Sequence, residues 1–340
     1  MVKKMVYRSL MIIIPGILFC GLAFTKEEAD VLYPPMVAYQ TGYLKVSAIH
    51  EIFYQLGGNP HGKPVMVIHG GPGAGCSSHD FRYFDPQKYL IILHDQRGAG
   101  QSRPYADLRE NTTAHLVADI EALRQFLKVD KVILFGGSWG TTLALAYAEA
   151  FPQHVSGMIL RGVFTATKQE IDHFYHGGTA SYFPENFEHL AQQIDHPEQK
   201  NYPVQLLAKM QSQDSVVRQE AARAWARYEA KIAFLNLPDQ RLDQMLTQWP
   251  FFAFSLIENH YMAHGCFLEE GQLLAQAEKL KEIPAIIING RYDIICPPIT
   301  AFRLHQKWPG SKLWIIEEAG HASSEPGIEA ALVLAARKFE

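Results

Sequence analysis

Ser138 is the residue of this chain best placed to act as a nucleophile. It is the third residue of Gly-Gly-Ser-Trp-Gly at positions 136–140, with an apolar run at 132–135 before it and a helix-prone run at 141–148 after it. A G-x-S-x-G pattern at a sharp strand-to-helix turn holds its serine exposed above the strand end, beside a helix N-terminus that favours negative charge. The glycines let the backbone turn where side chains would clash. The pattern predicts acyl transfer through a covalent serine intermediate.

A serine nucleophile needs a base, and the base needs an acid that orients it. Asp293 follows the apolar run 286–289, and His321 follows the next apolar run along the chain. Both are expected in loops after strands, where α/β folds collect functional groups. The order Ser, acid, His is the one that accompanies this type of serine turn. Taken alone, Asp293 reads equally well as a turn cap and His321 as a surface residue, but together they predict a Ser138–Asp293–His321 triad.

Asp95 is the main competing acid. It lies in Asp-Gln-Arg-Gly-Ala-Gly-Gln-Ser at 95–102, upstream of the serine and therefore in the wrong order for the triad. We interpret it as a residue that shapes a turn. Glu317 and Glu318, which closely precede His321, are interpreted as solvated charges at a strand end.

Acyl transfer also needs hydrogen-bond donors for the developing oxyanion. The segment His-Gly-Gly-Pro-Gly-Ala-Gly at 69–75 follows an apolar run at 65–68, and its glycines leave backbone N–H groups unobstructed. We predict that the Gly71 N–H pairs with the Trp139 N–H in an oxyanion hole. The alternative is a simple glycine turn.

Histidines at 173, 176, 260 and 264 are the only residues whose spacing raises the question of a metal. No H-E-x-x-H motif accompanies them, and a serine triad needs no metal. We therefore expect neither a metal nor a cofactor. The sequence Asn111-Thr112-Thr113 is a glycosylation sequon, but we interpret this segment as the N-terminal cap of the helix that follows.

The elements around these residues alternate between apolar strands and helices. Strands are expected at 64–69, 89–94, 132–135, 155–160, 283–289 and 312–316, and helices at 112–127, 141–148, 300–308 and up to residue 337. This alternation predicts an α/β fold with a mostly parallel sheet and helices on both faces. Residues 167–280 lack clear apolar strands and are expected to form an inserted helical cap. It divides the core into residues 31–166 and 281–340.

Composition describes an ordinary globular protein of 340 residues, with 48% hydrophobic residues, 19% charged residues and a formal net charge of −4. The acidic balance and the lack of a basic stripe argue against a nucleic-acid partner. Cys76, Cys266 and Cys296 remain once Cys20 is set aside with the N-terminal segment, so at most one disulfide can form among them.

The first 23 residues are predicted to be a signal peptide. Lys3, Lys4 and Arg8 precede an uncharged apolar stretch at 10–24, and Gly-Leu-Ala at 21–23 is a plausible cleavage site. We expect a protein exported to the periplasm or medium. The alternatives are an uncleaved membrane anchor and lipidation at Cys20, and only in those cases is a membrane partner expected.

The motifs together resemble those of the proline iminopeptidases (prolyl aminopeptidases) of the α/β-hydrolase superfamily. The matching pieces are HGGPGAG (69–75), DQRGAGQS (95–102), GGSWGTTLALAYA (136–148), LRGVF (160–164), FYHGGTASYFP (174–184), IENHY (257–261), GRYDIICP (290–297) and AGHASSEP (319–326). The resemblance implies an α/β-hydrolase fold with a cap. It also implies a serine aminopeptidase that releases N-terminal proline from small peptides, with the same triad as deduced above.

The same resemblance implies that Glu229 and Glu258, both in the cap, bind the α-amine of the substrate. Buried carboxylates are suited to pair with a cationic amine and to fix its distance from the scissile carbonyl. Without the resemblance, both glutamates would be interpreted as solvated helix residues. Tyr228 stands where the family usually has Trp. The alternatives for function are an esterase or amidase with the same frame, and a non-catalytic peptide-binding protein.

Overall fold

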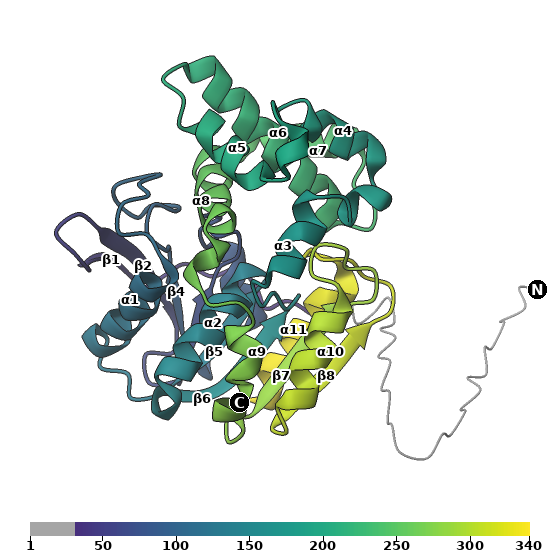
Figure 1. Cartoon of the computed structure of the whole chain (residues 1–340). Helices are drawn as coiled ribbons and strands as arrows, with labels where there is room; N and C mark the ends of the chain where they lie inside the picture. Colours follow the sequence, from purple (N-terminus) through teal and green to yellow (C-terminus); the bar gives the residue numbers. More distant parts are fainter. Residues whose placement is uncertain (1–30) are drawn as a thin grey trace, which may run out of the picture.

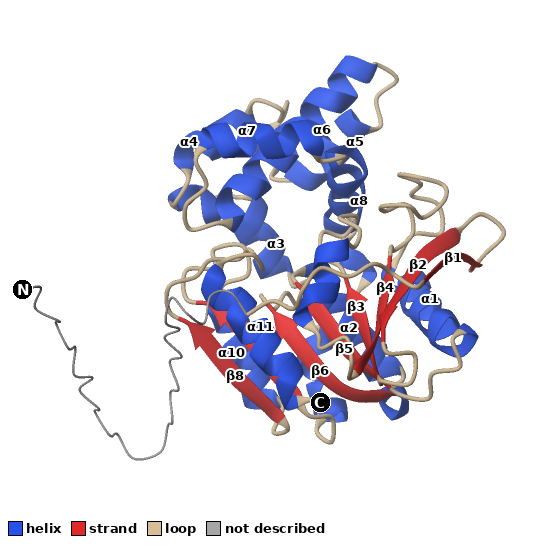
Figure 2. Cartoon of the chain, turned by 180° about the vertical axis from the view of Figure 1, so that it is seen from behind, coloured by secondary structure: helices blue, strands red, loops and turns tan. Residues whose placement is uncertain are grey.

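The computed structural model describes residues 31–340. Within them, one eight-stranded sheet runs in the order β1-β2-β4-β3-β5-β6-β7-β8 (Figures 1 and 2). Its strands are β1 (Gln40–Lys45), β2 (Glu51–Gly58), β3 (Lys63–Ile68), β4 (Tyr89–His94), β5 (Val132–Gly137), β6 (Val155–Arg161), β7 (Ala285–Gly290) and β8 (Ser311–Ile316). The six strands β3 to β8 are mutually parallel, and β2 joins β4 antiparallel. The predicted mostly parallel α/β sheet is confirmed.

The antiparallel hairpin of β1 and β2 at one edge of the sheet was not among the predicted elements. β1 is an edge strand whose side chains are all exposed or half-buried. It therefore carries no apolar run, which is the signal that marks a buried strand.

Both faces of the sheet are covered because its strands are apolar on both sides. Val65 and Val67 of β3 pack into one core layer, while Met66 and Ile68 pack into the other. The layer of Met66 and Ile68 includes residues of α1 (Thr113–Phe126), α2 (Trp139–Ala150) and α10 (Pro298–Lys307). The opposite layer includes residues of η1 (Ser78–Tyr83) and α11 (Pro326–Lys338). Successive residues of a strand point to opposite faces, so an unbroken apolar run fits a doubly covered sheet.

A group of helices lies over the sheet and forms the cap (Figure 1). They are α3 (Lys168–Tyr175), α4 (Pro184–Ala191), α5 (Tyr202–Met210), α6 (Ser215–Ala233), α7 (Asp239–Gln248) and α8 (Phe251–Ala263). The cap leaves the core after β6 and returns before β7. Among residues 31–340, no helix has the length and apolar character needed to cross a bilayer.

The last part of the segment predicted as cap lies against the core instead. The short helices α9 (Gln272–Ala275) and η6 (Ala277–Leu280) both contact α2, and both contact α10. The expected boundary at residue 280 therefore lies beyond the helices that stand over the sheet. Further 3-10 turns are η2 (Pro152–His154), η3 (Thr179–Ser181), η4 (Pro197–Gln199) and η5 (Gly265–Phe267).

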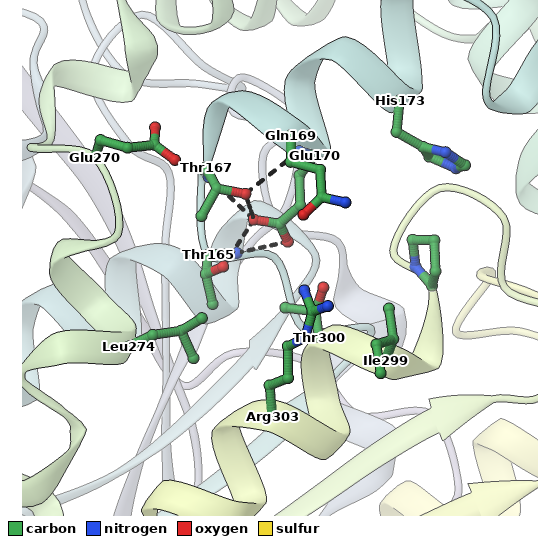
Figure 3. Close-up of a pocket in the computed structure, with 11 residues that line it drawn as sticks. Thr165, Thr167, Gln169, Glu170, His173, Glu270, Leu274, Ile299, Thr300 and Arg303 are labelled. Carbon is green, nitrogen blue, oxygen red and sulfur yellow. Dashed lines mark hydrogen bonds between the residues drawn. The ribbon is translucent and has the colours of Figure 1, made fainter.

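The turn that leads from β6 into the cap is held by Glu170 of α3. Its carboxylate accepts hydrogen bonds from the backbone N–H and hydroxyl groups of Thr165 and Thr167, at 2.7 to 3.1 Å. This cluster borders a cavity of about 330 Å³ between α3, α9 and α10, with Arg303 on its far side (Figure 3). The capping box of Thr167 and Glu170 fixes where α3 begins.

The N-cap of α1 lies within the segment 111–113, as the sequence predicts. Thr112 occupies the cap position, although its side chain makes no capping bond. The Asn111 side chain is buried, where it donates to the Arg97 and Asp107 carbonyls and accepts from the Tyr261 hydroxyl. The residue thus ties the 97–107 loop to α8. That contact depends on residues far apart in the chain, which a local capping pattern does not contain.

Candidate active site

Ser138 lies in the turn between β5 and α2, with φ +57° and ψ −126°. A positive φ is costly for a residue with a side chain, and such strain persists where the surroundings enforce it. A Cβ on Gly136 would lie 2.4 Å from the Gly140 carbonyl oxygen, and one on Gly140 would lie 2.1 Å from the Ile68 carbonyl oxygen. Both glycines are therefore required for the turn, as the sequence pattern predicts.

Asp293 and His321 lie together, although 28 residues separate them. Asp293 follows β7 and His321 follows β8, and His321 Nδ1 lies 2.8 Å from Asp293 Oδ2. The other carboxylate oxygen accepts the backbone N–H groups of Ile295 at 3.1 Å and Cys296 at 2.8 Å. The Asp293 side chain is fully buried. The carboxylate is thus fixed in place with one oxygen facing the imidazole.

Arg161, at the end of β6, is a site residue to which sequence reasoning gave no role. Its Nη1 lies 3.2 Å from His321 Nε2 and 3.0 Å from the His321 carbonyl oxygen. Because a guanidinium only donates, His321 Nε2 accepts this bond, and the ring proton is on Nδ1 facing Asp293. That tautomer leaves Nε2 basic. Among the hydrogen bonds of the described residues, none joins Ser138 to His321, a looseness that is common without substrate.

Gly162 follows Arg161 and lies directly behind the Asp293–His321 pair. Its φ is +59°, and a Cβ there would lie 3.0 Å from His321 Cε1 and 3.2 Å from Asp293 Oδ2. The LRGVF segment at 160–164 is one of the motifs that resemble the family, and the sequence alone suggested no separate role for Gly162. A glycine after an apolar strand was the signal that a close approach was needed there.

Cys296 is the other nucleophilic side chain next to Ser138. Burial, and after it the charge of Asp293, raises the pKa of this thiol well above its ordinary value. A protonated thiol is a poor nucleophile. Cys76, Cys266 and Cys296 are all free thiols in the described chain.

The two predicted oxyanion donors come from neighbouring strands. Gly71 follows β3 and Trp139 begins α2 after β5, and these two strands pair in parallel. A Cβ on the adjoining Gly70 would lie 3.5 Å from the Ser138 Cβ, so the glycine loop runs beside the nucleophile. Within residues 31–340, neither N–H donates to a backbone acceptor outside the helices and strands. The two amides therefore remain the candidate oxyanion donors.

Glu229 of α6 and Glu258 of α8 face each other in the cap. Their side chains hydrogen-bond to each other, and Glu258 Oε2 also accepts the Trp225 indole N–H at 2.6 Å. Burial raises the pKa of Glu229 to about 7, and burial together with the Glu229 carboxylate raises the pKa of Glu258 well above its usual range. A positive charge placed between two adjacent carboxyls would stabilise their ionised form, so the pair is suited to bind a cation.

Both helices that carry these glutamates touch the catalytic loops. The Ala233 carbonyl, one turn after Glu229 on α6, accepts the backbone N–H of His321 at 3.0 Å. On α8, Phe254 lies against Gly71 and Ile257 against Gly73, and Glu258 is the next residue. The carboxyl pair is therefore held within a helical turn of the histidine loop on one side and of the oxyanion loop on the other.

Glu325 is a second residue to which sequence reasoning gave no role. Its carboxylate accepts the N–H of Gly320, next to His321, and at 2.6 Å the N–H of Leu235, just after α6. Glu325 is buried and is the N-cap residue of α11. It joins the end of α6 to the histidine loop, so the cap and the triad are positioned by one carboxylate.

The other candidates are not part of this constellation. Asp95 accepts the N–H groups of Cys76 at 2.7 Å and Gln101 at 2.8 Å, which is a turn-forming role. His173 binds the Ile294 carbonyl, and His260 binds the Asn111 carbonyl. In the part of the chain that the structure describes, no three His, Cys, Asp or Glu side chains are grouped to hold a metal ion.

Solved structures with a similar fold are hydrolases. An α/β fold family hydrolase from Bacillus anthracis str. Sterne aligns with a TM-score of 0.59 at 20% identity, over 88% of this chain and 99% of that one. An esterase from Exiguobacterium antarcticum aligns with a TM-score of 0.58 at 21% identity, over 87% and 98%. At these identities the likeness shows the fold alone.

Sequence comparison is more specific. The family described as "alpha/beta hydrolase fold" matches residues 63–327. A proline iminopeptidase of Arabidopsis thaliana is 43% identical over 94% of this chain and 84% of its own length. The proline iminopeptidase of Xanthomonas citri is also 43% identical, over 91% of this chain and 99% of its own length. By its fold, its serine turn and these relatives, the chain belongs to the proline iminopeptidase family of the α/β hydrolases.

Proposed function

We propose that this protein is a prolyl aminopeptidase that hydrolyses the bond after an N-terminal proline by way of an acyl-enzyme on Ser138. The observation that carries the proposal is the pairing of the half-buried Glu229 with the buried Glu258, held one helical turn from the histidine and oxyanion loops. An esterase needs no such pair, whereas an aminopeptidase must bind a cationic amine at a fixed distance from the carbonyl.

In the proposed reaction, the substrate amine binds between the two glutamates, which places the prolyl carbonyl over Ser138. His321 Nε2 exchanges its bond with Arg161 for the serine hydroxyl and accepts the hydroxyl proton as Oγ attacks the carbonyl carbon. The N–H groups of Gly71 and Trp139 stabilise the oxyanion. His321 then donates the proton to the leaving amine. In the second step water attacks the acyl-enzyme, His321 accepts the proton of the water, and it then returns a proton to Ser138 Oγ.

The decisive experiment is the hydrolysis of prolyl β-naphthylamide compared with a simple acyl ester. Wild-type protein should prefer the prolyl amide, and Ser138→Ala should lower its turnover by about 10⁴- to 10⁶-fold while the protein stays folded. Ser156→Ala, at an exposed position of β6, is the matched control and should be fully active. Preference for the ester over every aminoacyl amide would identify an esterase instead. Near-normal turnover by Ser138→Ala would remove this serine from the mechanism.

We further propose that the protein is exported and that its substrates are small peptides outside the cytoplasm. The support is the charged and apolar pattern of residues 1–24. Those residues lie outside the described part of the structure, so the predicted signal peptide depends on sequence alone. The cytoplasmic membrane is a partner only if this segment is retained or lipidated.

A further inference from the structure

The two predicted oxyanion donors belong to loops after different strands, so something must hold their separation. Transition-state stabilisation by fixed dipoles depends on donors that stand in place before the reaction. A displacement of a few tenths of an ångström in such a site is felt in the rate. The side chain that links these two loops is Gln96.

Gln96 lies in a third loop, directly after β4, and is 3% exposed. Its backbone N–H donates to His69 Nε2, and its side-chain Nε2 donates to the His69 carbonyl oxygen, both at 2.9 Å. Its Oε1 accepts the indole N–H of Trp139 at 2.9 Å. The Gln96 carboxamide therefore binds His69, two residues before Gly71, and the side chain of Trp139, which supplies the other donor.

The orientation of this carboxamide is fixed by chemistry. An indole N–H only donates and a peptide carbonyl only accepts, so Oε1 must face Trp139 and Nε2 must face His69. The His69 ring is held as well. Burial lowers the pKa of His69, and its Nε2 accepts a bond, so the neutral ring carries its proton on Nδ1, 2.9 Å from the Gly70 carbonyl oxygen.

We infer that Gln96 is a positioning residue that sets the distance between the Gly71 and Trp139 N–H groups and so controls transition-state stabilisation rather than substrate binding. It does not touch the substrate; it acts through the two loops. This inference rests on the proposed function, because the reaction whose rate Gln96 affects is the proposed prolyl hydrolysis. The glutamates that bind the amine lie on other elements, so their contribution to substrate binding is left unchanged when Gln96 is altered.

The test uses Gln96→Met, which keeps the length and apolar stem but loses both side-chain hydrogen bonds, and Gln96→Glu, which keeps the acceptor for Trp139 and replaces the donor to His69. With prolyl β-naphthylamide, kcat should fall about 10- to 100-fold while KM stays within about twofold, as expected when stabilisation is lost only in the transition state. Trp139→Phe removes the indole end of the link, together with part of the buried ring that packs on Tyr261, and should lower kcat in the same way.

A second readout separates positioning from a general loss of structure. Boroproline forms a tetrahedral adduct with a reactive serine, whereas free proline binds without one. The inhibition constant of boroproline should rise by the same factor as kcat falls, and that of proline should not change. Trp308→Phe is the matched control: it also removes a buried indole-to-carbonyl bond, from Trp308 to Ile283 at 3.0 Å, but just before the N-terminal end of β7, away from the site.

Trp308→Phe should lower the melting temperature but leave kcat unchanged. If folded Gln96→Met retains kcat within about threefold of wild type, or if boroproline and proline weaken equally, the inference is overturned. If Gln96→Met does not fold, Gln96→Glu and Trp139→Phe decide by the same two inhibitors. A wild-type protein that ignores the prolyl amide would refute the proposed function instead, and Gln96 would then be tested on whichever acyl substrate that protein accepts.

Discussion

At the scale of residues, the site is built from side chains that each have their orientation fixed by a second contact. Asp293 is held by two backbone N–H groups, and His321 is held by Asp293 on one nitrogen and Arg161 on the other. Glu258 is held by the Trp225 indole. Because these second contacts fix the orientation of the site side chains, substitutions of residues that only contact them should still lower the reaction rate.

Gly162→Ala is expected to lower kcat at least about tenfold. The new methyl group would lie about 3 Å from both members of the Asp293–His321 pair and would push them apart. Gly271→Ala is the matched control, since Gly271 has a similar positive φ of +71° but nothing within 4 Å of the added Cβ. Steady-state kinetics and melting curves of both variants give the answer. Equal effects on activity would mean that backbone strain alone is responsible.

Glu229→Gln and Glu258→Gln should each weaken kcat/KM for free prolyl substrates by about 2–4 kcal/mol, the cost of unpairing a charge in a desolvated site. N-acetylprolyl substrates carry no cation, so wild type should process them poorly, and the variants should lose little more. Glu220→Gln, an exposed glutamate on the same helix, is the control. Similar losses on free and acetylated substrates would assign the pair a role in the fold rather than in amine recognition.

At the scale of elements, α2 follows the serine turn directly and packs in the core, so a residue on it can affect the stability of the fold. The helix contacts η6, and Glu149 is buried on α2 at 7% exposure. Burial raises the pKa of Glu149 from 4.5 to about 8, against the opposing effects of Lys279 and Gln272. A buried carboxyl of this kind favours the protonated form in the folded state.

The pH dependence follows from this shift. Between pH 4.5 and about 8, the folded protein binds more protons at Glu149 than the unfolded chain, so its contribution to stability is complete below 4.5 and is lost as the pH rises through 8. Glu149→Gln removes that dependence. Its melting temperature relative to wild type should increase from pH 5 to pH 9, by at least about 2 °C at pH 9. A difference independent of pH would show that Glu149 ionises freely when folded.

At the scale of the whole molecule, parallel strands bring distant residues to one edge. The serine, the acid and the histidine follow β5, β7 and β8. The cap helices, α6 and α8 among them, lie over the sheet (Figure 2). Every residue named in the proposed reaction lies within residues 31–340.

The signal-peptide proposal therefore predicts a mature N-terminus near Phe24 and activity outside the cytoplasm. N-terminal sequencing of protein from its native host, with fractionation of the activity, is the measurement. Protein produced from residue 24 onward should have the kcat and KM of the full chain. A native protein that begins at Met1 in the soluble cytosolic fraction would contradict export, and a lipidated Cys20 would indicate anchoring.

Local sequence patterns predicted the serine turn, the order Ser138, Asp293, His321 and the parallel strands, because these depend on an apolar run, glycines at a sharp turn, and polar residues just after strands. The family resemblance added the cap glutamates. Only the tertiary structure showed that Arg161, Gly162, Gln96 and Glu325 contact the site, that α9 and η6 belong to the core, and that Asn111 ties a loop to α8. Those roles depend on contacts between segments tens to hundreds of residues apart, and no local pattern of residue types records which distant chain segment a side chain will meet.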